Sequence, residues 1–155
     1  MKKDNSIIIG SGVIGSYLAK FLLSKKQKII VTSRKRKKSY TNYNKLDIEN
    51  KVIFEELDVL KKNEILKLLK KYTPKNIFYF SGQSSLTKSI KLKKITNDSN
   101  YIGAKKILEI LHKYELKTNF YKANSGYIFE PNKGLVNIKS KISKNKNPYI
   151  QSQIK

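Results

Sequence analysis

Three glycines near the amino terminus have the spacing of a turn that binds a diphosphate. Gly10, Gly12 and Gly15 form the pattern G-x-G-x-x-G, after a short apolar run and before a segment with helical spacing. In that context the first glycine permits a tight turn, the second lets the backbone approach a pyrophosphate, and the third lets the helix pack closely on a sheet. The positive end of the helix then faces the anion. The pattern predicts a dinucleotide-binding turn; the alternative is three turn glycines without a ligand.

The residues after the second apolar run indicate which dinucleotide would bind. A turn that selects NAD usually has Asp or Glu there to bind the ribose 2′-hydroxyl. This chain instead has Ser33, Arg34, Lys35 and Arg36. Cations suit a 2′-phosphate, and arginine can hold it with two parallel hydrogen bonds. The prediction is NADP, with NAD less favoured; the alternative is one more solvated basic loop in a basic protein.

Further cofactor contacts are expected after the third and fourth apolar runs. Asp58, in the segment LDV, is placed to accept a hydrogen bond from the adenine amino group. Ser81 and Gly82 end the fourth run, where the backbone must pass the cofactor. The complete set of predicted cofactor-binding residues is Gly10, Gly12, Val13, Ile14, Gly15, Arg34, Lys35, Asp58, Val59, Ser81, Gly82 and Gln83.

Strands and helices must alternate to position these residues. Short apolar or β-branched runs predict strands at residues 6–9, 28–32, 52–57, 76–80 and 119–122. Helical spacing follows the first glycines, and residues 64–72 and most of 86–114 are also predicted helical. Residues 33–45 and 132–146 are predicted as loops, and Pro148 is expected to open a last helix. This alternation predicts an α/β protein with a doubly wound parallel sheet, the Rossmann fold.

Two of these helices have faces that can be assigned from the sequence. In the first, the residues expected to share an apolar face are Ile14, Leu18, Phe21 and Leu22. In the helix over residues 64–72, the residues expected to point inward are Ile65, Leu68 and Leu69. The aromatic run Phe78, Tyr79 and Phe80 is best interpreted as strand core rather than as a stacking surface.

The composition limits the class of protein. The chain has 155 residues and 39% apolar residues, enough for one domain over residues 1–155 with a genuine core. It has no cysteine, which excludes disulfides and thiolate metal sites, and no metal site is predicted. We find neither a secretory signal nor a long apolar segment of the kind that spans a membrane. The expected location is the cytoplasm.

The net charge of +23 raises the question of a polyanionic partner. Clustered cations bind nucleic acids through their phosphates. Lysine here is spread over almost every predicted element, however, rather than gathered on one stripe with aromatic residues. The pattern favours a lysine-rich composition over nucleic-acid binding, and leaves general attraction to acidic surfaces open. The single histidine, His112, is expected to face solvent.

Taken together, the motifs resemble the extended short-chain dehydrogenase/reductases, and within them the GDP-mannose 4,6-dehydratases. The resemblance spans residues 7–150. It is carried by the segments GSYLAKFLL, SRKR, LDVL, FYFSGQSSLTKS, NYIGAKKILEIL, FYKANSGYIF and NPYIQSQ. The fifth of these is similar to the family helix N-x-x-G-[TA]-x-x-L-L. The order and spacing of the segments match one continuous domain.

The resemblance implies an NADP-dependent lyase that converts GDP-mannose to GDP-4-keto-6-deoxymannose. In the family, the sugar is oxidised at C4, water leaves across C5 and C6, and the hydride returns at C6. Position by position, the resemblance assigns catalytic roles to Ser125, as the hydroxyl residue, and to Tyr149, as the tyrosine of Y-x-x-x-K. A phenolate is a suitable base for an alcohol proton, and a nearby ammonium favours it. Family members usually pair through helices of this half, which makes a homo-oligomer an expectation.

The sequence departs from the family at several catalytic positions. Gln153 stands where the family has the lysine, and Tyr127 where it has the glutamate that assists elimination. Lys155 lies six residues after Tyr149 and is expected to point away from it. The chain ends before the last strands and the substrate domain of the family. These departures argue against catalysis by this polypeptide alone. Three explanations are open: a fragment of a longer enzyme, a domain completed by a neighbouring chain, or a decayed homologue. The alternatives are an NAD(P)-dependent sugar-nucleotide epimerase or reductase, and a non-catalytic dinucleotide-binding module.

Overall fold

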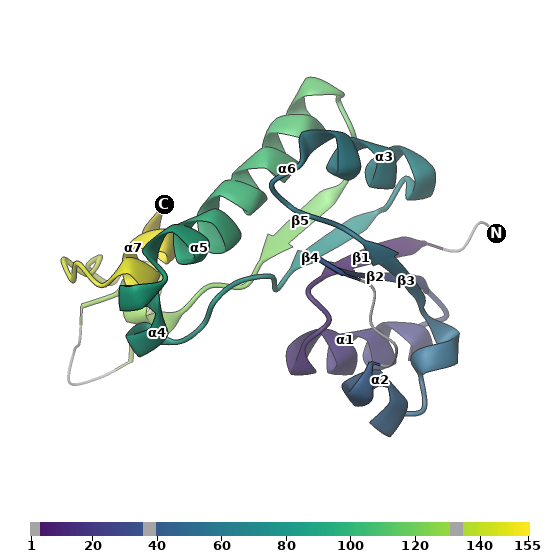
Figure 1. The fold of residues 1–155 in the computed structure, drawn as a ribbon, viewed down its shortest axis with the longest axis horizontal. Coiled ribbons are helices and arrows are strands. Elements are labelled where there is room, and N and C mark those ends of the chain that lie inside the picture. Colours follow the sequence, from purple (N-terminus) through teal and green to yellow (C-terminus); the bar gives the residue numbers. More distant parts are fainter. Residues whose placement is uncertain (1–3, 36–39, 131–134) are drawn as a thin grey trace. The chain divides into compact units, whose positions relative to one another are not determined.

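A sheet of five parallel strands, in the order β3-β2-β1-β4-β5, is the centre of the fold in the computed structural model, which describes residues 4–35, 40–130 and 135–155 (Figure 1). The strands are β1 (Asn5–Ile9), β2 (Lys28–Ser33), β3 (Ile53–Glu56), β4 (Asn76–Tyr79) and β5 (Asn119–Lys122). In the register, Ile7 lies beside Ile30 on one side and Ile77 on the other. Parallel strands that are covered on both faces have continuous runs of apolar residues in their sequence. For this reason these strands could be predicted.

The chain divides into two compact units. The first unit is formed by Met1–Ser81 and Ala104–Ala123, and the second by Gly82–Gly103 and Asn124–Lys155. The sheet and the helices that cover it belong to the first unit. The second unit contains short helices and loops, and it carries both residues to which the family resemblance assigns catalysis.

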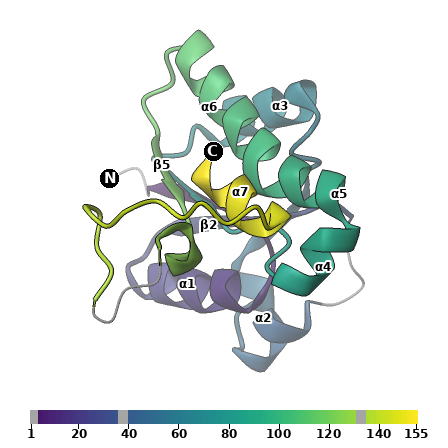
Figure 2. The same ribbon diagram turned by 90° about the vertical axis from the view of Figure 1, so that its left-hand side faces the viewer.

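Helices cover both faces of the sheet in the first unit (Figures 1 and 2). α1 (Val13–Ser24) and α2 (Thr41–Lys45) lie on one face, with α3 (Lys62–Tyr72) and α6 (Gly103–Lys113) on the other. One core joins α3 and α6 to strand residues such as Ile7 and Ile77, and a second core joins α1 and α2 to Ile8 and Val31. The fold is the predicted doubly wound parallel sheet, with β1 at its centre.

The apolar face predicted for α1 was wrong in part. Ile14 is 65% exposed and Phe21 57% exposed. The residues that α1 buries are Gly15, Ser16, Ala19 and Leu22. Three of these four are small, because α1 packs so closely on the sheet that large side chains do not fit between them. By contrast, the three residues predicted to point inward from α3, Ile65, Leu68 and Leu69, are buried.

The basic segment after β2, predicted as a loop over residues 33–45, contains a helix. α2 occupies Thr41–Lys45 and buries Tyr43 completely. The ring of Tyr43 stands edge-on to Phe54, with centroids 5.1 Å apart, and Tyr40 stacks on the same ring. The burial of Tyr43 thus stabilises a short helix in a segment whose polar, basic composition predicted a solvated loop. A 3-10 turn, η1 (Glu49–Lys51), follows it before β3.

The second unit is built from short helical elements. The segment predicted to be mostly helical contains α4 (Leu86–Lys91), α5 (Lys93–Asn97) and a π-helical turn η2 (Asp98–Ile102) before α6 begins. A 3-10 turn η3 (Gly126–Ile128) follows β5, and Phe129 forms an isolated bridge with Ile142. The last helix, α7 (Pro148–Ile154), begins with proline at its first position as predicted, and it packs against α4, α5, η2 and η3.

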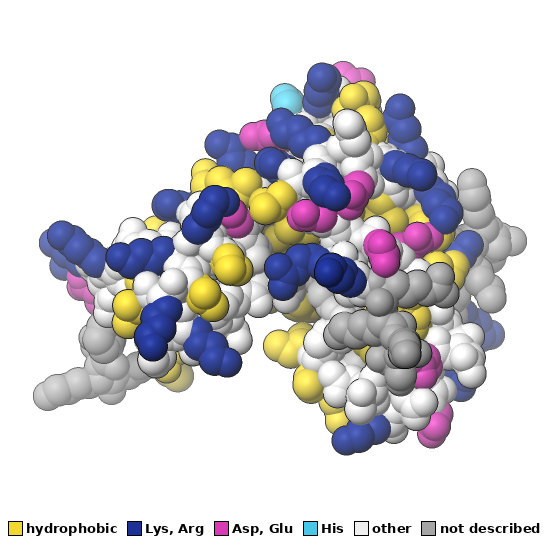
Figure 3. Space-filling view, viewed as in Figure 1, with side chains coloured by type: hydrophobic (Ala, Val, Ile, Leu, Met, Phe, Trp, Pro, Cys, Tyr) yellow, Lys and Arg dark blue, Asp and Glu magenta, His cyan; other side chains and the backbone are white. Residues whose placement is uncertain are grey.

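Basic side chains are scattered over the face shown in Figure 3, with acidic ones between them. This distribution agrees with the lysine-rich composition. In the part of the chain that the structure describes, no helix is long and apolar enough to cross a membrane. No group of three or more His, Cys, Asp or Glu side chains there is placed to hold a metal ion.

Candidate functional site

Gly10 lies at the point of the sheet where the strand order reverses, between the ends of β1 and β4. Its φ angle is +117°, a conformation that residues with a side chain rarely adopt. A Cβ atom at this position would stand 2.9 Å from the carbonyl carbon of Phe80 and 3.0 Å from the nitrogen of Ser81. Both the turn and the neighbouring strand therefore require glycine here.

Gly15 is required by the packing of α1 on the sheet. A Cβ atom there would overlap the carbonyl oxygen of Gly10 and would stand 3.2 Å from Cγ2 of Ile8. The third glycine of the motif thus allows the close approach of helix and strand that the spacing predicted.

Gly12, by contrast, is required by neither conformation nor packing. Its φ and ψ angles of −78° and −171° suit any residue, and a Cβ atom would meet nothing within 4 Å. No side chain caps the start of α1, and its first turn holds no acidic residue. Val13 and Ile14, the first two helical residues, are 57% and 65% exposed. The backbone N–H groups at this positive helix end therefore face an approachable surface.

Arg34 and Lys35 follow β2 directly. Because β2 runs parallel to β1, both residues leave the sheet at the same edge as the glycine turn. The Ser33 hydroxyl donates to the carbonyl oxygen of Lys35 at 2.8 Å and so fixes the start of this segment, while both cationic side chains are exposed. Arg36 lies outside the described residues.

Asp58 and Val59 follow β3 at the same edge of the sheet. Oδ1 of Asp58 accepts from the Leu60 nitrogen at 2.9 Å, and the Asp58 nitrogen donates to Glu64 at 2.9 Å. One carboxylate oxygen of Asp58 is thus used in the turn that opens α3. Val59 is 6% exposed and belongs to the core, so it can reach a ligand only through its main chain.

Ser81 lies two residues after the end of β4 and is the last residue of the first unit before the chain enters the second. It is half-buried and hydrogen-bonds with the phenol of Tyr79, the last residue of β4. Burial raises the pKa of that phenol, so Tyr79 stays neutral and serves as core, as predicted.

Gly82 and Gln83, the last two predicted cofactor contacts, belong to the second unit. A Cβ atom on Gly82 would overlap Oδ1 of Asn100, so glycine is required there by one buried side chain. The Gln83 nitrogen donates to that same oxygen at 2.9 Å, and its carbonyl accepts from Nδ2 of Asn100 at 3.0 Å. Asn100 therefore fixes this loop through its main chain.

The two candidate catalytic residues also belong to the second unit. Ser125 precedes η3, and its hydroxyl accepts from the Tyr127 nitrogen at 3.3 Å. Tyr149 is the second residue of α7, which packs against η3. Gln153 follows one turn later, and its carbonyl accepts from Nδ2 of Asn124 at 3.3 Å. The structure thus brings α7, which carries Tyr149, into contact with η3, the turn that Ser125 precedes.

Lys155 does not replace the missing lysine of the Y-x-x-x-K pattern. Its ammonium donates to Oδ1 of Asn97 at 3.1 Å and lies 5.5 Å from the centre of the Tyr101 ring. This cation is therefore directed to the junction of α5 and η2.

Sequence reasoning missed the polar residues that hold α7. Ser89, Asn100 and Ser152 are each at most 2% exposed, and Asn147 hydrogen-bonds with the first of them. Only Asn147 had a usable signal, because an asparagine directly before a proline is typical of a helix start. The other three form hydrogen bonds across long stretches of sequence, which no local pattern reveals.

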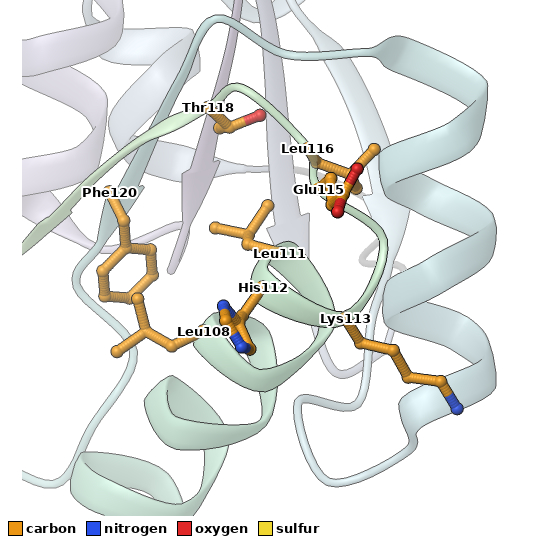
Figure 4. Close-up of a pocket in the computed structure, with 8 residues that line it drawn as sticks. All are labelled: Leu108, Leu111, His112, Lys113, Glu115, Leu116, Thr118 and Phe120. Carbon is orange, nitrogen blue, oxygen red and sulfur yellow. The ribbon is translucent and has the colours of Figure 1, made fainter.

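A groove of about 730 Å³ opens beside the carboxyl end of α6 (Figure 4). Its lining includes Leu108, His112 and Phe120, and His112 is exposed there as predicted. The neighbouring residues Leu116 and Thr118 precede β5, so the groove lies near the amino end of that strand. Ligands of open α/β sheets bind at the carboxyl ends of the strands. The groove is therefore not the candidate site.

The sheet order and the glycine turn define a Rossmann-type protein. Residues 7–151 match the family model described as GDP-mannose 4,6 dehydratase. The match covers most of the chain, and the chain belongs to that family.

Curated relatives act on nucleotide sugars, as their names state. A CDP-paratose 2-epimerase of Salmonella typhi is 29% identical over 121 residues, which cover 77% of this chain and 36% of that protein. A GDP-mannose 4,6-dehydratase of Yersinia enterocolitica is 29% identical over 140 residues, covering 83% of this chain and 37% of that protein. This chain thus spans a little over a third of the length of these relatives.

Solved structures share the fold. The UDP-glucose 4-epimerase of Brucella ovis, in complex with NAD, has a TM-score of 0.82 at 19% identity; the match covers 97% of this chain and 45% of that one. The UDP-glucose 4-epimerase of Stenotrophomonas maltophila, with bound NAD, has a TM-score of 0.85 at 15% identity, covering 97% and 46%. At this identity the likeness concerns the fold.

Proposed function

We propose that this chain binds a dinucleotide at the Gly10–Gly15 turn, and that it is the NADP-binding part of a nucleotide-sugar dehydratase. In this proposal both compact units belong to one cofactor-binding domain. The observation that supports it most strongly is Gly12. Its backbone conformation is ordinary and the space where a side chain would stand is empty. A glycine that the fold itself does not need is explained by a ligand that approaches the backbone.

The start of α1 supports an anionic ligand. It lacks a side-chain cap and an acidic residue in its first turn, so its N–H groups and its positive end are available to a diphosphate. Arg34 and Lys35 leave the sheet at the same edge, and both are exposed. Two cations after β2 favour NADP, because the 2′-phosphate adds charge that a ribose hydroxyl lacks.

The reaction in which the bound cofactor takes part would be a nucleotide-sugar conversion. When bound, the nicotinamide supplies a hydride acceptor and donor. In this proposal, the Ser125 hydroxyl orients the sugar by hydrogen bonding, and the Tyr149 phenol holds or moves the alcohol proton. Gln153 carries no charge where the family has lysine, and Tyr127 lacks the carboxylate that assists elimination in the family. We therefore expect this chain to bind the cofactor without completing a 4,6-dehydration by itself.

Calorimetric titration with NADPH and NADH tests the cofactor proposal. We expect saturable binding of both, tighter for NADPH. The double variant Arg34→Ala/Lys35→Ala should weaken NADPH binding about tenfold or more, because it removes charge-assisted hydrogen bonds, and should leave NADH binding nearly unchanged. Lys20→Ala/Lys67→Ala removes the same charge from two exposed helix positions and should affect neither ligand. Equal affinity for the two ligands in all proteins would contradict the NADP assignment.

A second candidate is an epimerase or reductase of the same family. Tyr127 in place of the eliminating glutamate supports it, as does the relative named as a CDP-paratose 2-epimerase. The products of dehydration and epimerisation differ in mass, because dehydration removes water from the sugar and epimerisation does not. Mass spectrometry of GDP-mannose and CDP-sugar incubations, with NMR of the sugar ring, separates them. Dinucleotide binding without either conversion supports a binding role for this chain.

A further inference from the structure

α7, the helix that carries Tyr149, is too short to hold its position by itself. It has seven residues, and those that it buries are Ile150 and Ser152. Isolated helices of this length are not stable in water. Because Ile150 is the one apolar side chain that α7 buries, the placement of α7 depends strongly on directional hydrogen bonds to the elements around it.

One hydrogen-bonded bridge fixes the start of α7. Oδ1 of Asn147 accepts from the Tyr149 nitrogen at 2.9 Å, as a helix cap, and from the buried Ser89 hydroxyl of α4 at 3.0 Å. Nδ2 of Asn147 donates to the carbonyl oxygen of Leu86 at 3.3 Å. This cap ties the first turn of α7 to α4.

A second bridge fixes the other end of the helix. Asn100, 2% exposed, donates from Nδ2 to the Ser152 hydroxyl at 3.0 Å. Ser152 in turn donates to the carbonyl oxygen of Tyr149 at 2.6 Å. The same Asn100 side chain holds both main-chain groups of Gln83, as described above.

Asn100 is the central residue of η2, the π-helical turn. A π-helical turn displaces the side chains of a helix from their usual positions and occurs often at functional sites. Here it accompanies an asparagine that spans two segments: the loop Gly82–Gln83 on one side and α7 on the other. A side chain at position 82 would overlap Oδ1 of Asn100. The loop can therefore pack this closely against the asparagine only with glycine at that position.

We propose that Ser152 is a positioning residue that couples the Gly82–Gln83 loop to the Tyr149 helix through Asn100. The assignment of Gln83 to the cofactor and of Tyr149 to the reaction rests on the proposed function. The coupling itself rests on the hydrogen bonds. Without the Ser152 hydroxyl, Nδ2 of Asn100 loses a partner inside the protein, and the loop and the helix are no longer held by the same side chain.

Amide hydrogen exchange of the full chain, without ligand, tests the coupling. The Gln83 amide reports on the far end of the bridge, because its hydrogen bond goes to Asn100 and not to Ser152. In Ser152→Ala we expect the Gln83 amide to exchange about tenfold faster, together with the amides of α7. Ser152→Thr keeps the hydroxyl and should restore slow exchange at Gln83. The amides of β1 serve as the reference for global stability.

A matched control distinguishes the effect of losing the bridge to Asn100 from the effect of losing any serine hydroxyl in a helix. The Ser24 hydroxyl donates to the carbonyl three residues earlier, as Ser152 does, but Ser24 is exposed on α1. Ser24→Ala should leave Gln83 unchanged. Faster exchange in α7 with an unchanged Gln83 amide in Ser152→Ala would overturn the coupling, because Ser152 would then act within its own helix.

A second measurement, with NADPH added, links the bridge to the cofactor. In the natural sequence we expect slower exchange both at the start of α1 and in α7. In Ser152→Ala the slowing at α1 should persist while that in α7 is lost. Equal slowing of α7 in both proteins would count against the link. If NADPH slows nothing at α1, the proposed function fails, while the ligand-free comparison still decides the coupling.

Discussion

The carbonyl oxygen of Gly10 occupies the space that a Cβ atom on Gly15 would need. The end of β1 and the first turn of α1 are therefore in direct backbone contact, without a side chain between them. This contact sets the distance between the helix start and the sheet, and with it the place of the Gly12 backbone.

Replacement of Gly15 by alanine should destabilise the protein. Alanine favours a helix by about 1 kcal/mol over glycine. Overpacking against a backbone oxygen, which cannot rotate away, costs about 1–3 kcal/mol. We expect a net loss of up to about 2 kcal/mol in the free energy of unfolding, measured by urea denaturation. Gly126→Ala is the control, because a Cβ atom there meets nothing within 4 Å. A gain in stability for Gly15→Ala would mean that α1 can move away from β1.

Replacement of Gly12 by threonine should abolish dinucleotide binding and leave the fold intact. Glycine and threonine are similar as helix caps, and the position has room for the side chain. The free energy of unfolding should therefore change by less than about 0.5 kcal/mol. The side chain would fill the space proposed for the diphosphate, so NADPH affinity should fall at least about a hundredfold. Calorimetry and urea denaturation of the same samples measure both effects; unchanged affinity would refute the proposed site.

The neighbouring tyrosines of the α1–α2 core should respond differently to loss of their hydroxyls. Tyr43 is fully buried, and its hydroxyl has no hydrogen-bond partner among the described residues. Tyr43→Phe should therefore raise the free energy of unfolding by up to about 1 kcal/mol, because an unsatisfied polar group is removed. The Tyr40 hydroxyl hydrogen-bonds with Ser33 at 3.1 Å, so Tyr40→Phe should cost about 1 kcal/mol. Thermal denaturation of both variants checks the contrast; equal losses would show that Tyr43 has a partner, such as bound water.

Glu64 should make the stability depend on acid pH. The pKa of its carboxyl is lowered, first by the hydrogen bond from the Asp58 nitrogen and then by that from Lys61. A lowered pKa in the folded state means that Glu64 stabilises the protein above its unfolded pKa of about 4.3. That contribution is lost as the pH falls through the lower, folded value.

The variant Glu64→Gln isolates this effect. It should be less stable than the natural protein at pH 7, and the difference should shrink as the pH falls through the lowered pKa of the folded-state carboxyl. Urea denaturation over a series of pH values measures it. Glu115→Gln removes a carboxylate from an exposed turn and is the control for net charge. A stability difference that stays constant with pH would contradict the role of the Glu64 charge.

Local patterns were sufficient for the strands and for the glycine turn. β5 was predicted over the same residues that the structure gives it, and the helix after Pro148 also begins where predicted. The buried face of α1 was not predictable from its large apolar residues, because the contact with the sheet is made by small ones. α2 was not predicted either, because its single buried side chain, Tyr43, lies in a polar, basic segment that has no apolar pattern.

By itself the sequence determined the parallel sheet and the turn at Gly10. A strand buried on both faces requires a run of apolar residues, and a positive φ angle favours glycine, so both features are visible within a single segment. The tertiary structure decided which side of α1 meets the sheet and that Gly12 has open space beside it. It also decided that Asn100 joins Gln83, 17 residues away, to Ser152, 52 residues away. Such hydrogen bonds depend on where the folded chain brings distant segments together, and no spacing within one segment encodes them.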